Sequence, residues 1–382
     1  MSNAELDAAP LDKFPQVPFT PGPNWFRLEL LARRSSVPHG TVLTDHLVSD
    51  ALQGNALNDP VRRPILVYLP DRYRTSPNER FPVVYLLHGA MTDVGSWLRR
   101  GTSHRSLIET IDSVVAAEGD AIVVMADAWT SVGGSQYVNS PLIGRYRDYI
   151  VDDVVRWVDE SFRTLPEPGG RAILGHSSGG LGAWVACTQR SGTFGVLGML
   201  AADCLFEGVY LTTLGPAVRR LREHYRGSMG YFWSTHGIGD GASEARIFQP
   251  RGGRGRAWEP DDSPIYDQNM LAMAFAGPDA ETAEYLFRKE SGEIDERVWS
   301  RWLTFDPVRS AGSFLPELNQ LSLISVAAAS NDEYYADNGA AALGGILADH
   351  QISHEMITGY GTHEPGELFQ QQLGSIVRAL RG

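Results

Sequence analysis

The sequence contains few cysteines, no long hydrophobic run and fewer basic than acidic residues. Its two cysteines, Cys187 and Cys204, are too few for a disulfide framework and lack the spacing of a structural zinc site. No apolar stretch approaches the roughly 18 residues needed to cross a bilayer, and Met1 to Pro10 lack the basic start and apolar segment of a signal peptide. We therefore expect a soluble, cytoplasmic protein that uses no metal or other cofactor.

The charge balance argues against nucleic acid and membranes as partners. There are 46 acidic and 33 basic residues, which gives a net charge of −13. Such a surface repels phosphate backbones and anionic lipid headgroups. The run Arg251-Gly252-Gly253-Arg254-Gly255-Arg256 is of a kind that can bind RNA, but it is not repeated, so we interpret it as a loop.

The length and composition are those of a globular protein. The 382 residues are 43% hydrophobic and 21% charged, which excludes disordered and coiled-coil classes. At about 150 residues per domain, the length fits two to three domains or one α/β domain with an insertion. The sequence is compatible with a homo-oligomer as well as with a monomer.

Strand and helix patterns alternate along most of the chain. Residues 1–24 are too rich in proline for a helix and are expected to form a surface arm. The run 83–87 is apolar on both faces, as in a central parallel strand. Further strands are predicted at 65–69, 121–126, 172–174, 196–202, 321–329 and 355–358, and helices at 147–163, 178–190, 338–349 and 366–380. This alternation predicts a doubly wound, mostly parallel sheet, with its core formed by 25–204 and 306–382.

Residues 205–305 interrupt this alternation and differ from it in composition. They are rich in aromatic residues, which include Tyr225, Tyr231, Phe232, Trp233, Tyr266, Phe275, Tyr285, Phe287, Trp299 and Trp302. We interpret the segment as a cap over the carboxyl edge of the sheet, where ligands of open α/β folds bind. The alternative is that the segment has a structural role and packs away from the carboxyl edge of the sheet.

The clearest chemical motif is Gly-His-Ser-Ser-Gly at 175–179, directly after a predicted strand and directly before a predicted helix. This context is typical of a nucleophile elbow, whose tight turn requires residues without side chains at both ends. Ser177 is therefore the candidate nucleophile. The helix that follows would direct the backbone N–H of Ser178 at a developing oxyanion.

A serine hydroxyl needs a base to accept its proton. His363 is the candidate, because the loop that carries it, Gly359-Tyr360-Gly361-Thr362-His363, lies between the last predicted strand and the last helix. His350 and His354 also follow the serine, at the spacing of a metal-ligand pair. The residues between them are typical of a turn leaving a helix, so we interpret both as surface residues rather than as a metal site.

An acid must orient the base, and Ser330-Asn331-Asp332-Glu333 follows a predicted strand at the expected point in the chain. We favour Asp332, with Glu333 and Asp337 as alternatives. Asp203 ends the preceding strand and is another alternative orienter, although a substrate-side or helix-capping carboxylate fits it better.

The second oxyanion donor is expected in the loop after the strand 83–87. That loop reads Leu87-His88-Gly89-Ala90-Met91, and Gly89 would allow the turn that directs the N–H of Ala90 toward Ser178. Asp127 ends another strand, and we expect it to cap the chain there.

Several of these motifs resemble one known family. They are VYLPDRY (67–73), FPVVYLLHG (81–89) with Trp97 downstream, RDYIVDDVVRWVDESF (147–162), GHSSGG (175–180), ASND (329–332) and GTH (361–363). The sequence is similar to the esterase D-like family of α/β-hydrolases, which includes S-formylglutathione hydrolases, feruloyl and acetylxylan esterases, enterochelin esterases and mycobacterial mycolyltransferases. The resemblance spans roughly 60–200 and 306–382, and the long aromatic insertion departs from many relatives.

The resemblance implies an acyl-transfer enzyme with Ser177, Asp332 and His363 as its triad and oxyanion donors at Ser178 and Ala90. We expect substrate contacts from Trp97, His176, Asp203 and Trp233. The leading hypothesis is hydrolysis of a carboxylic ester of a small molecule through an acyl-enzyme, with an apolar or aromatic group suggested by the cap. The alternatives are acyl transfer to an alcohol or sugar, and a non-catalytic binding protein that retains the scaffold.

Overall fold

The structure, a computed structural model, describes residues 25, 28–35, 37–98, 106–229, 231–232, 260–288 and 291–381. The arm predicted at 1–24, Trp233 and the arginine-glycine run at 251–256 lie outside these residues. Within them, no helix combines the length and apolar character needed to span a bilayer. Both cysteines are buried and unpaired.

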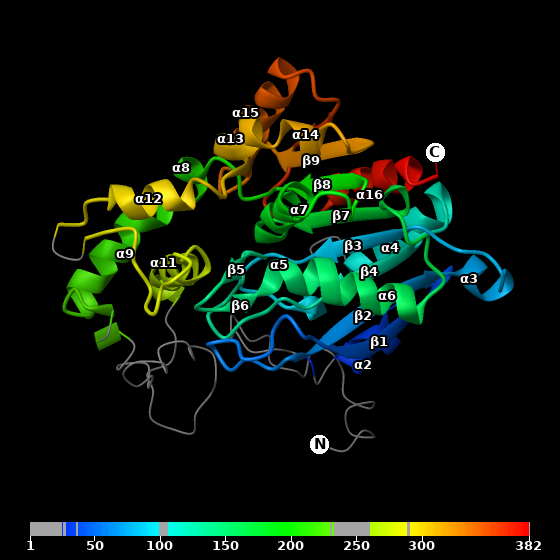
Figure 1. The fold of residues 1–382 in the computed structure, drawn as a ribbon, viewed down its shortest axis with the longest axis horizontal. Helices are drawn as coiled ribbons and strands as arrows, with labels where there is room; N and C mark the ends of the chain where they lie inside the picture. Colours follow the sequence, from blue (N-terminus) through cyan, green and yellow to red (C-terminus); the bar gives the residue numbers. More distant parts are fainter. Residues whose placement is uncertain are drawn as a thin grey trace.

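The centre of the fold is a sheet of eight strands in the order β1-β2-β4-β3-β7-β8-β9-β10 (Figure 1). The strands β3, β4, β7, β8, β9 and β10 run parallel, whereas β2 pairs antiparallel with both β1 and β4. Their bounds are β1 (Gly40–Val48), β2 (Arg62–Pro70), β3 (Val83–Leu87), β4 (Ile122–Ala126), β7 (Arg171–His176), β8 (Val196–Leu200), β9 (Leu323–Ala329) and β10 (Glu355–Gly359). A second, two-stranded sheet joins β5 (Asn139–Ser140) to β6 (Gly144–Arg145).

Alternate side chains of the central strands enter two separate cores. In β3, for example, Val83, Tyr85 and Leu87 face one hydrophobic cluster, and Val84 and Leu86 face the other. The first core is covered by α5 (Tyr146–Asp148), η4 (Tyr149–Val154), α6 (Val155–Ser161), α7 (Ser178–Gln189) and α15 (Ala336–Asp349). The second is covered by α2 (Leu28–Arg34), η3 (Val94–Leu98), α4 (Leu107–Glu118) and α16 (Glu367–Ala379).

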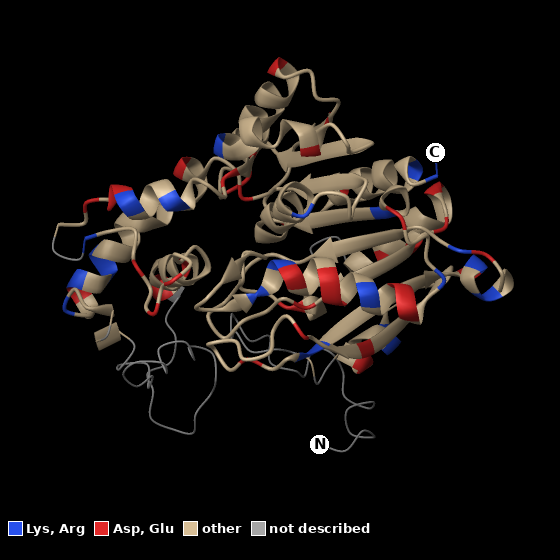
Figure 2. Cartoon of the chain, viewed as in Figure 1, with Lys and Arg blue, Asp and Glu red and all other residues tan. Residues whose placement is uncertain are grey.

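Short helices complete the connections between these elements. They are α3 (Asp71–Thr75), η5 (Pro168–Gly170), α13 (Pro307–Ser310), η8 (Ala311–Ser313) and α14 (Leu315–Leu318). Acidic residues predominate along η4 and α6, whereas the charged residues of α9 and α12 in the insertion are mostly arginines (Figure 2).

The insertion contributes α8 (Phe206–Val209), α9 (Leu211–His224), η7 (Pro260–Asp262), α11 (Ser263–Ala274) and α12 (Glu296–Trp302). In Figure 1, α9, α11 and α12 lie together beyond one end of the sheet. Most of their aromatic rings pack on one another: Tyr225 contacts Phe232, and Phe275 contacts both Trp302 and Phe305.

The predicted doubly wound, mostly parallel sheet is confirmed, and all seven predicted strands are present within one to three residues. Helix α4 was not among the predicted helices. The basis for an apolar substrate is removed, because burial of Tyr225, Phe232, Phe275 and Trp302 commits these aromatic side chains to the insertion's own packing.

Candidate active site

Ser177 occupies the sharp turn between β7 and α7. Its backbone has φ 56° and ψ −124°, a conformation that residues other than glycine rarely adopt. Because Ser178 is the first residue of α7, its N–H is one of the four at a helix start that lack a partner within the helix. The turn therefore presents the hydroxyl and this N–H at the same edge of the sheet.

Two glycines make this turn sterically feasible. A Cβ atom on Gly175 would lie 1.9 Å from the carbonyl oxygen of Gly179, and one on Gly179 would lie 2.3 Å from the carbonyl oxygen of Leu87. Both distances are far inside van der Waals contact. The requirement for glycine at both ends of the motif, expected from the sequence, is thus met by backbone packing.

His363 and Asp332 are hydrogen-bonded to each other at the same edge. Nδ1 of His363 lies 2.9 Å from Oδ2 of Asp332, whose other oxygen accepts the N–H of Tyr334. Burial alone would lower the pKa of His363, but the hydrogen bond and charge of Asp332 raise it above its usual value. Conversely, burial opposes ionisation of Asp332, and the bond from His363 brings the pKa of Asp332 below its usual value.

The alternative acids have other contacts. Glu333 accepts the main-chain N–H of His363 through Oε2 at 2.9 Å. Asp337 lies in the first turn of α15. Of the downstream acids, Asp332 is the one bonded to the imidazole.

Asp203 bonds to the nucleophile itself. Ser177 Oγ donates to Oδ1 of Asp203 at 3.4 Å, while Oδ2 accepts from Tyr210 Oη at 2.8 Å and from Gln136 Nε2 at 3.0 Å. Burial raises the pKa of Asp203, and these bonds offset the effect only in part. In the described part of the chain, the hydroxyl is thus bonded to Asp203, and the imidazole of His363 to Asp332.

His176 links the nucleophile strand to the histidine loop. Its Nε2–H donates to the main-chain oxygen of His363 at 2.8 Å, and the two rings lie 4.8 Å apart. Burial, together with the positive charge of His363, lowers the pKa of His176 to about 3, so this ring stays neutral. His176 therefore positions the loop rather than exchanging protons.

The loop after β3 packs directly against the nucleophile, since a Cβ on Gly89 would lie 3.3 Å from Cβ of Ser177. The carbonyl oxygen of Gly89 accepts from Nδ1 of His88 at 2.9 Å and from Oγ1 of Thr92 at 2.8 Å. That carbonyl shares a peptide plane with the N–H of Ala90. Fixing the oxygen therefore fixes the direction of the predicted oxyanion donor.

Two further contacts hold this loop. Nε2 of His88 accepts the N–H of Ala128 at 2.9 Å, and Oδ1 of Asp127 accepts the N–H of Val94, the first residue of η3, at 3.0 Å. Asp127 therefore caps a helix, as expected, and it forms a buried ion pair with Arg63 at 3.5 Å. Neither His88 nor Thr92 was predicted from the sequence to act in the site.

Helix α11 of the insertion brings another acid to the site. Burial and the charge of Asp203 together raise the pKa of Asp267 to about 7. Asp267 in turn acts electrostatically on Tyr334, whose ring stands edge-on to His363 at 4.6 Å. On the same helix, the side chain of Met270 approaches Gly134. A Cβ atom added to Gly134 would lie 2.7 Å from Sδ of Met270 and 3.5 Å from Cβ of Ala90. The insertion therefore contributes to the surroundings of Ser177.

Comparison with known families identifies the chain. The family described as "Putative esterase" matches residues 55–344, most of the sequence. The chain belongs to this esterase family. The family membership expected from the motifs is thereby confirmed.

Curated relatives match the chain over a shorter stretch. Esterase Rv1288 of Mycobacterium tuberculosis is 32% identical over 136 residues, which make up 34% of this chain and 26% of that protein. An endo-1,4-beta-xylanase/feruloyl esterase of Xylanibacter ruminicola is 30% identical over 141 residues, 35% of this chain and 19% of that protein. The chain thus spans about a quarter or less of the length of these relatives.

Solved structures resemble the chain over about nine tenths of its length. A ferulic acid esterase superposes with a TM-score of 0.54 at 16% identity, covering 90% of this chain and 99% of its own. The S-formylglutathione hydrolase of Staphylococcus aureus gives a TM-score of 0.53 at 15% identity, covering 90% and 100%. At such identities the likeness shows the fold alone, which is that of an α/β-hydrolase.

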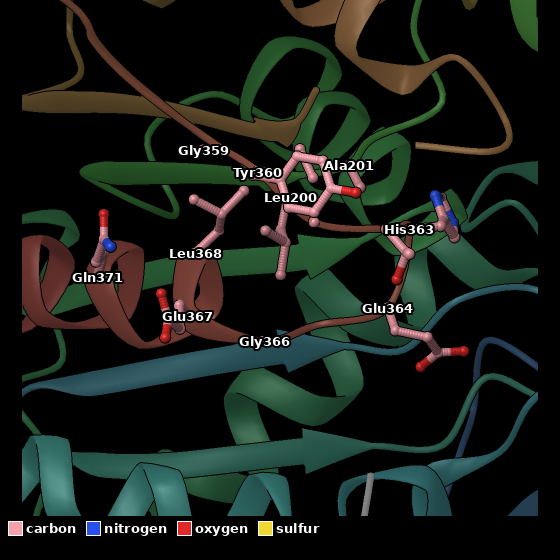
Figure 3. Close-up of a pocket in the computed structure, with 13 residues that line it drawn as sticks. Leu200, Ala201, Gly359, Tyr360, His363, Glu364, Gly366, Glu367, Leu368 and Gln371 are labelled. Atoms are coloured by element: carbon pink, nitrogen blue, oxygen red, sulfur yellow. The ribbon is translucent and has the colours of Figure 1, made fainter. Parts of the chain in front are cut away.

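A cavity of about 140 Å³ lies beside the loop that carries His363. Figure 3 shows its lining, which comes mainly from the end of β8, the loop after β10 and the start of α16. His363 is part of that lining, whereas Ser177 and Asp203 are not. The cavity therefore lies behind the histidine loop and not over the nucleophile.

Of the four predicted substrate contacts, the structure brings His176 and Asp203 to Ser177. Trp97 instead lies in the second core, 2% exposed and with its ring 5.9 Å from that of Phe369 on α16, so we withdraw it as a substrate contact. Trp233 lies outside the described residues. Among those residues, no group of three or more His, Cys, Asp or Glu side chains is arranged to hold a metal ion.

Proposed function

We propose that this protein hydrolyses a carboxylic ester, with Ser177 as nucleophile, His363 as general base and Asp332 as the acid that orients the base. The observation that carries the proposal is the 2.9 Å bond between His363 and Asp332 at the sheet edge where the strained turn presents Ser177. This is the division of roles found in serine esterases, where the acid fixes the tautomer of the base.

The reaction begins with a rotation of the Ser177 hydroxyl. Its bond to Asp203 is long, at 3.4 Å, and the hydroxyl must turn toward Nε2 of His363 before it can give up its proton. Catalytic hydrogen bonds of this kind often form only when substrate is bound. Asp203 thus holds the resting position of the nucleophile.

Attack by Ser177 then gives a tetrahedral oxyanion that the N–H groups of Ser178 and Ala90 stabilise. His363 protonates the leaving alcohol, and water attacks the acyl-enzyme with His363 again as base. The fixed peptide between Gly89 and Ala90 supports this assignment, because a donor that does not reorient during the reaction stabilises the oxyanion most.

The insertion 205–305 has the role of a cap in this account. The influence of Asp267 on Asp203 and Tyr334, and the approach of Met270 to Gly134, support that role. Whether water or another alcohol accepts the acyl group depends on what the capped pocket admits. A cytoplasmic location stays a prediction from the sequence.

Covalent labelling with a fluorophosphonate tests the proposal. We expect the protein to label once, Ser177→Ala to abolish labelling, and His363→Ala to slow it by about 10²–10⁴. The exposed Ser191→Ala serves as the matched control and should label like the unaltered protein. An unaltered protein that does not label would instead favour the non-catalytic binding protein.

A further inference from the structure

The imidazole of His363 is hydrogen-bonded at one of its two nitrogens. Nδ1 lies 2.9 Å from Oδ2 of Asp332, whereas Nε2 has no hydrogen bond among the described residues. The hydroxyl of Ser177, which Nε2 must meet in the proposed reaction, is bonded to Asp203 instead. A single hydrogen bond leaves a ring free to pivot about the bonded nitrogen. The position of Nε2 therefore depends on what packs against the imidazole.

Two rings from distant parts of the chain contact that imidazole. The ring of His176, at the end of β7, has its centre 4.8 Å away and is inclined by 48°. The ring of Tyr334, between β9 and α15, has its centre 4.6 Å away and is inclined by 62°. These distances and angles are those of packed aromatic rings. Together the two contacts limit the pivoting that the bond to Asp332 permits.

The main chain of Tyr334 is fixed to the acid that orients the base. Its N–H donates to Oδ1 of Asp332 at 2.8 Å, while Oδ2 of the same carboxylate is bonded to His363. The N–H of the next residue, Tyr335, donates to the main-chain oxygen of Asp332 at 3.1 Å, which closes the turn. One fully buried carboxylate thus places both the imidazole and the residue whose ring packs on it.

The side chain of Tyr334 takes no part in the hydrophobic cores. The residue is 49% exposed and belongs to none of the clusters formed by the described residues. Its hydroxyl makes no hydrogen bond within the described part of the chain. Burial, the largest effect on this hydroxyl, raises the pKa of Tyr334, so the ring stays neutral where histidine titrates. What the side chain contributes is therefore its contact with His363.

We propose that Tyr334 is a positioning residue of the active site, whose ring holds the imidazole of His363 so that Nε2 meets the hydroxyl of Ser177. This inference rests on the proposed esterase function. Tyr334 acts through the base and not on the substrate. Because a misplacement of about 1 Å in a reacting group can cost about 10²-fold in rate, loss of the ring contact lowers kcat.

A double-mutant cycle with His363 tests the proposal, with the rate of fluorophosphonate labelling as the readout. We expect Tyr334→Ala to slow labelling by about 10- to 100-fold in the otherwise unaltered protein. In His363→Ala the same change should have no further effect, because no imidazole is left to position. Tyr334→Phe keeps the ring and should label at nearly the unaltered rate. The matched control is Tyr335→Ala: Tyr335 is 51% exposed and has no ring contact with His363 among the described residues.

The outcomes separate this inference from the proposed function. An unaltered protein that neither labels nor hydrolyses p-nitrophenyl acetate would overturn the proposed function itself. If the unaltered protein labels at Ser177, the inference alone is overturned by an unaltered rate in Tyr334→Ala. It is also overturned by an equal loss with and without His363, or by a Tyr334→Phe variant as slow as Tyr334→Ala.

Steady-state hydrolysis of p-nitrophenyl acetate gives an independent readout. Tyr334→Ala should lower kcat with little change in KM, because the ring places the base and does not bind the ester. A raised KM with unchanged kcat would make Tyr334 a substrate contact and would overturn its positioning role.

Discussion

His176 and His363 are joined by a hydrogen bond of 2.8 Å from Nε2 of His176 to the main-chain oxygen of His363. The bond couples the residue before the nucleophile to the loop that carries the base. Because the pKa of His176 is lowered to about 3, the donor remains neutral throughout the range in which esterases work. The two adjacent imidazoles thus have different roles: His176 positions the loop, and His363 transfers protons in the proposed reaction.

On its acid side the pH dependence should therefore report His363 and not His176. His363 accepts a proton only when neutral, and its pKa is raised by Asp332, Asp203 and Glu333. We expect kcat/KM to fall as the pH drops through a value above the usual 6.5 of histidine. Removing the charge in Asp332→Asn lowers that pKa, so the residual activity should fall at a lower pH. If kcat/KM of Asp332→Asn fell at a higher pH than that of the unaltered protein, this would contradict the assignment of the acid limb to His363 paired with Asp332.

The orienting role of Asp332 makes a second prediction. Asp332→Asn should lower kcat by about 10³–10⁴. The amide oxygen can stay on the N–H of Tyr334, which leaves the NH2 donor facing Nδ1 of His363 and favours the wrong tautomer of His363. Glu333→Gln is the matched comparison. Among the described residues, the Glu333 side chain is hydrogen-bonded to the main-chain N–H of His363 and not to its imidazole, so this substitution should lower kcat by less than about tenfold. The activity of both variants is measured with p-nitrophenyl acetate. Similar losses of kcat would mean that activity depends on holding the His363 loop in place rather than on orientation of the imidazole by Asp332.

Thr92 should influence the rate without touching substrate. Thr92→Val keeps the volume but removes one of two donors to the carbonyl oxygen of Gly89, so the peptide that carries the Ala90 N–H becomes less fixed. We expect kcat to fall by about tenfold with little change in KM, compared with about 10²–10³ for loss of an oxyanion donor. Steady-state kinetics decides this, and a raised KM with unchanged kcat would assign Thr92 to ground-state binding.

Two glycine-to-alanine variants distinguish a glycine required by close packing, Gly179, from one in a helix with open space around it, Gly345. Gly179→Ala places a Cβ 2.3 Å from the backbone of Leu87 and should cost about 3 kcal/mol or more of unfolding free energy. Gly345→Ala, in open space on α15, should stabilise by about 0.5–1 kcal/mol. Chemical denaturation measures both. A well-tolerated Gly179→Ala would mean that the turn can relax, contrary to the packing described.

The sequence predicts those features that depend on local pattern. The buried strands follow from apolar runs, and the position of Ser177 follows from a turn whose glycines have no steric alternative. The pairing of His363 with Asp332 could be expected because parallel strands end at one edge of the sheet.

Other features depend on contacts between distant segments. Nothing local indicates that the Ser177 hydroxyl rests on Asp203, or that His88 and Thr92 share the carbonyl of Gly89. Trp97 was misjudged because a tryptophan after a strand end can pack inward or outward, and here it packs on Phe369. The aromatic residues of the insertion were misjudged for the same reason, since composition does not say which way a ring faces.

The most direct measurement is the identity of the acylated residue. The protein is mixed with p-nitrophenyl acetate, quenched within one turnover, digested and analysed by mass spectrometry. We predict a burst of about one p-nitrophenol per protein and one acetyl group on the tryptic peptide 172–190, attached to Ser177 and absent from Ser177→Ala. Acetyl on another residue, or turnover by Ser177→Ala at the unaltered rate, would contradict the account.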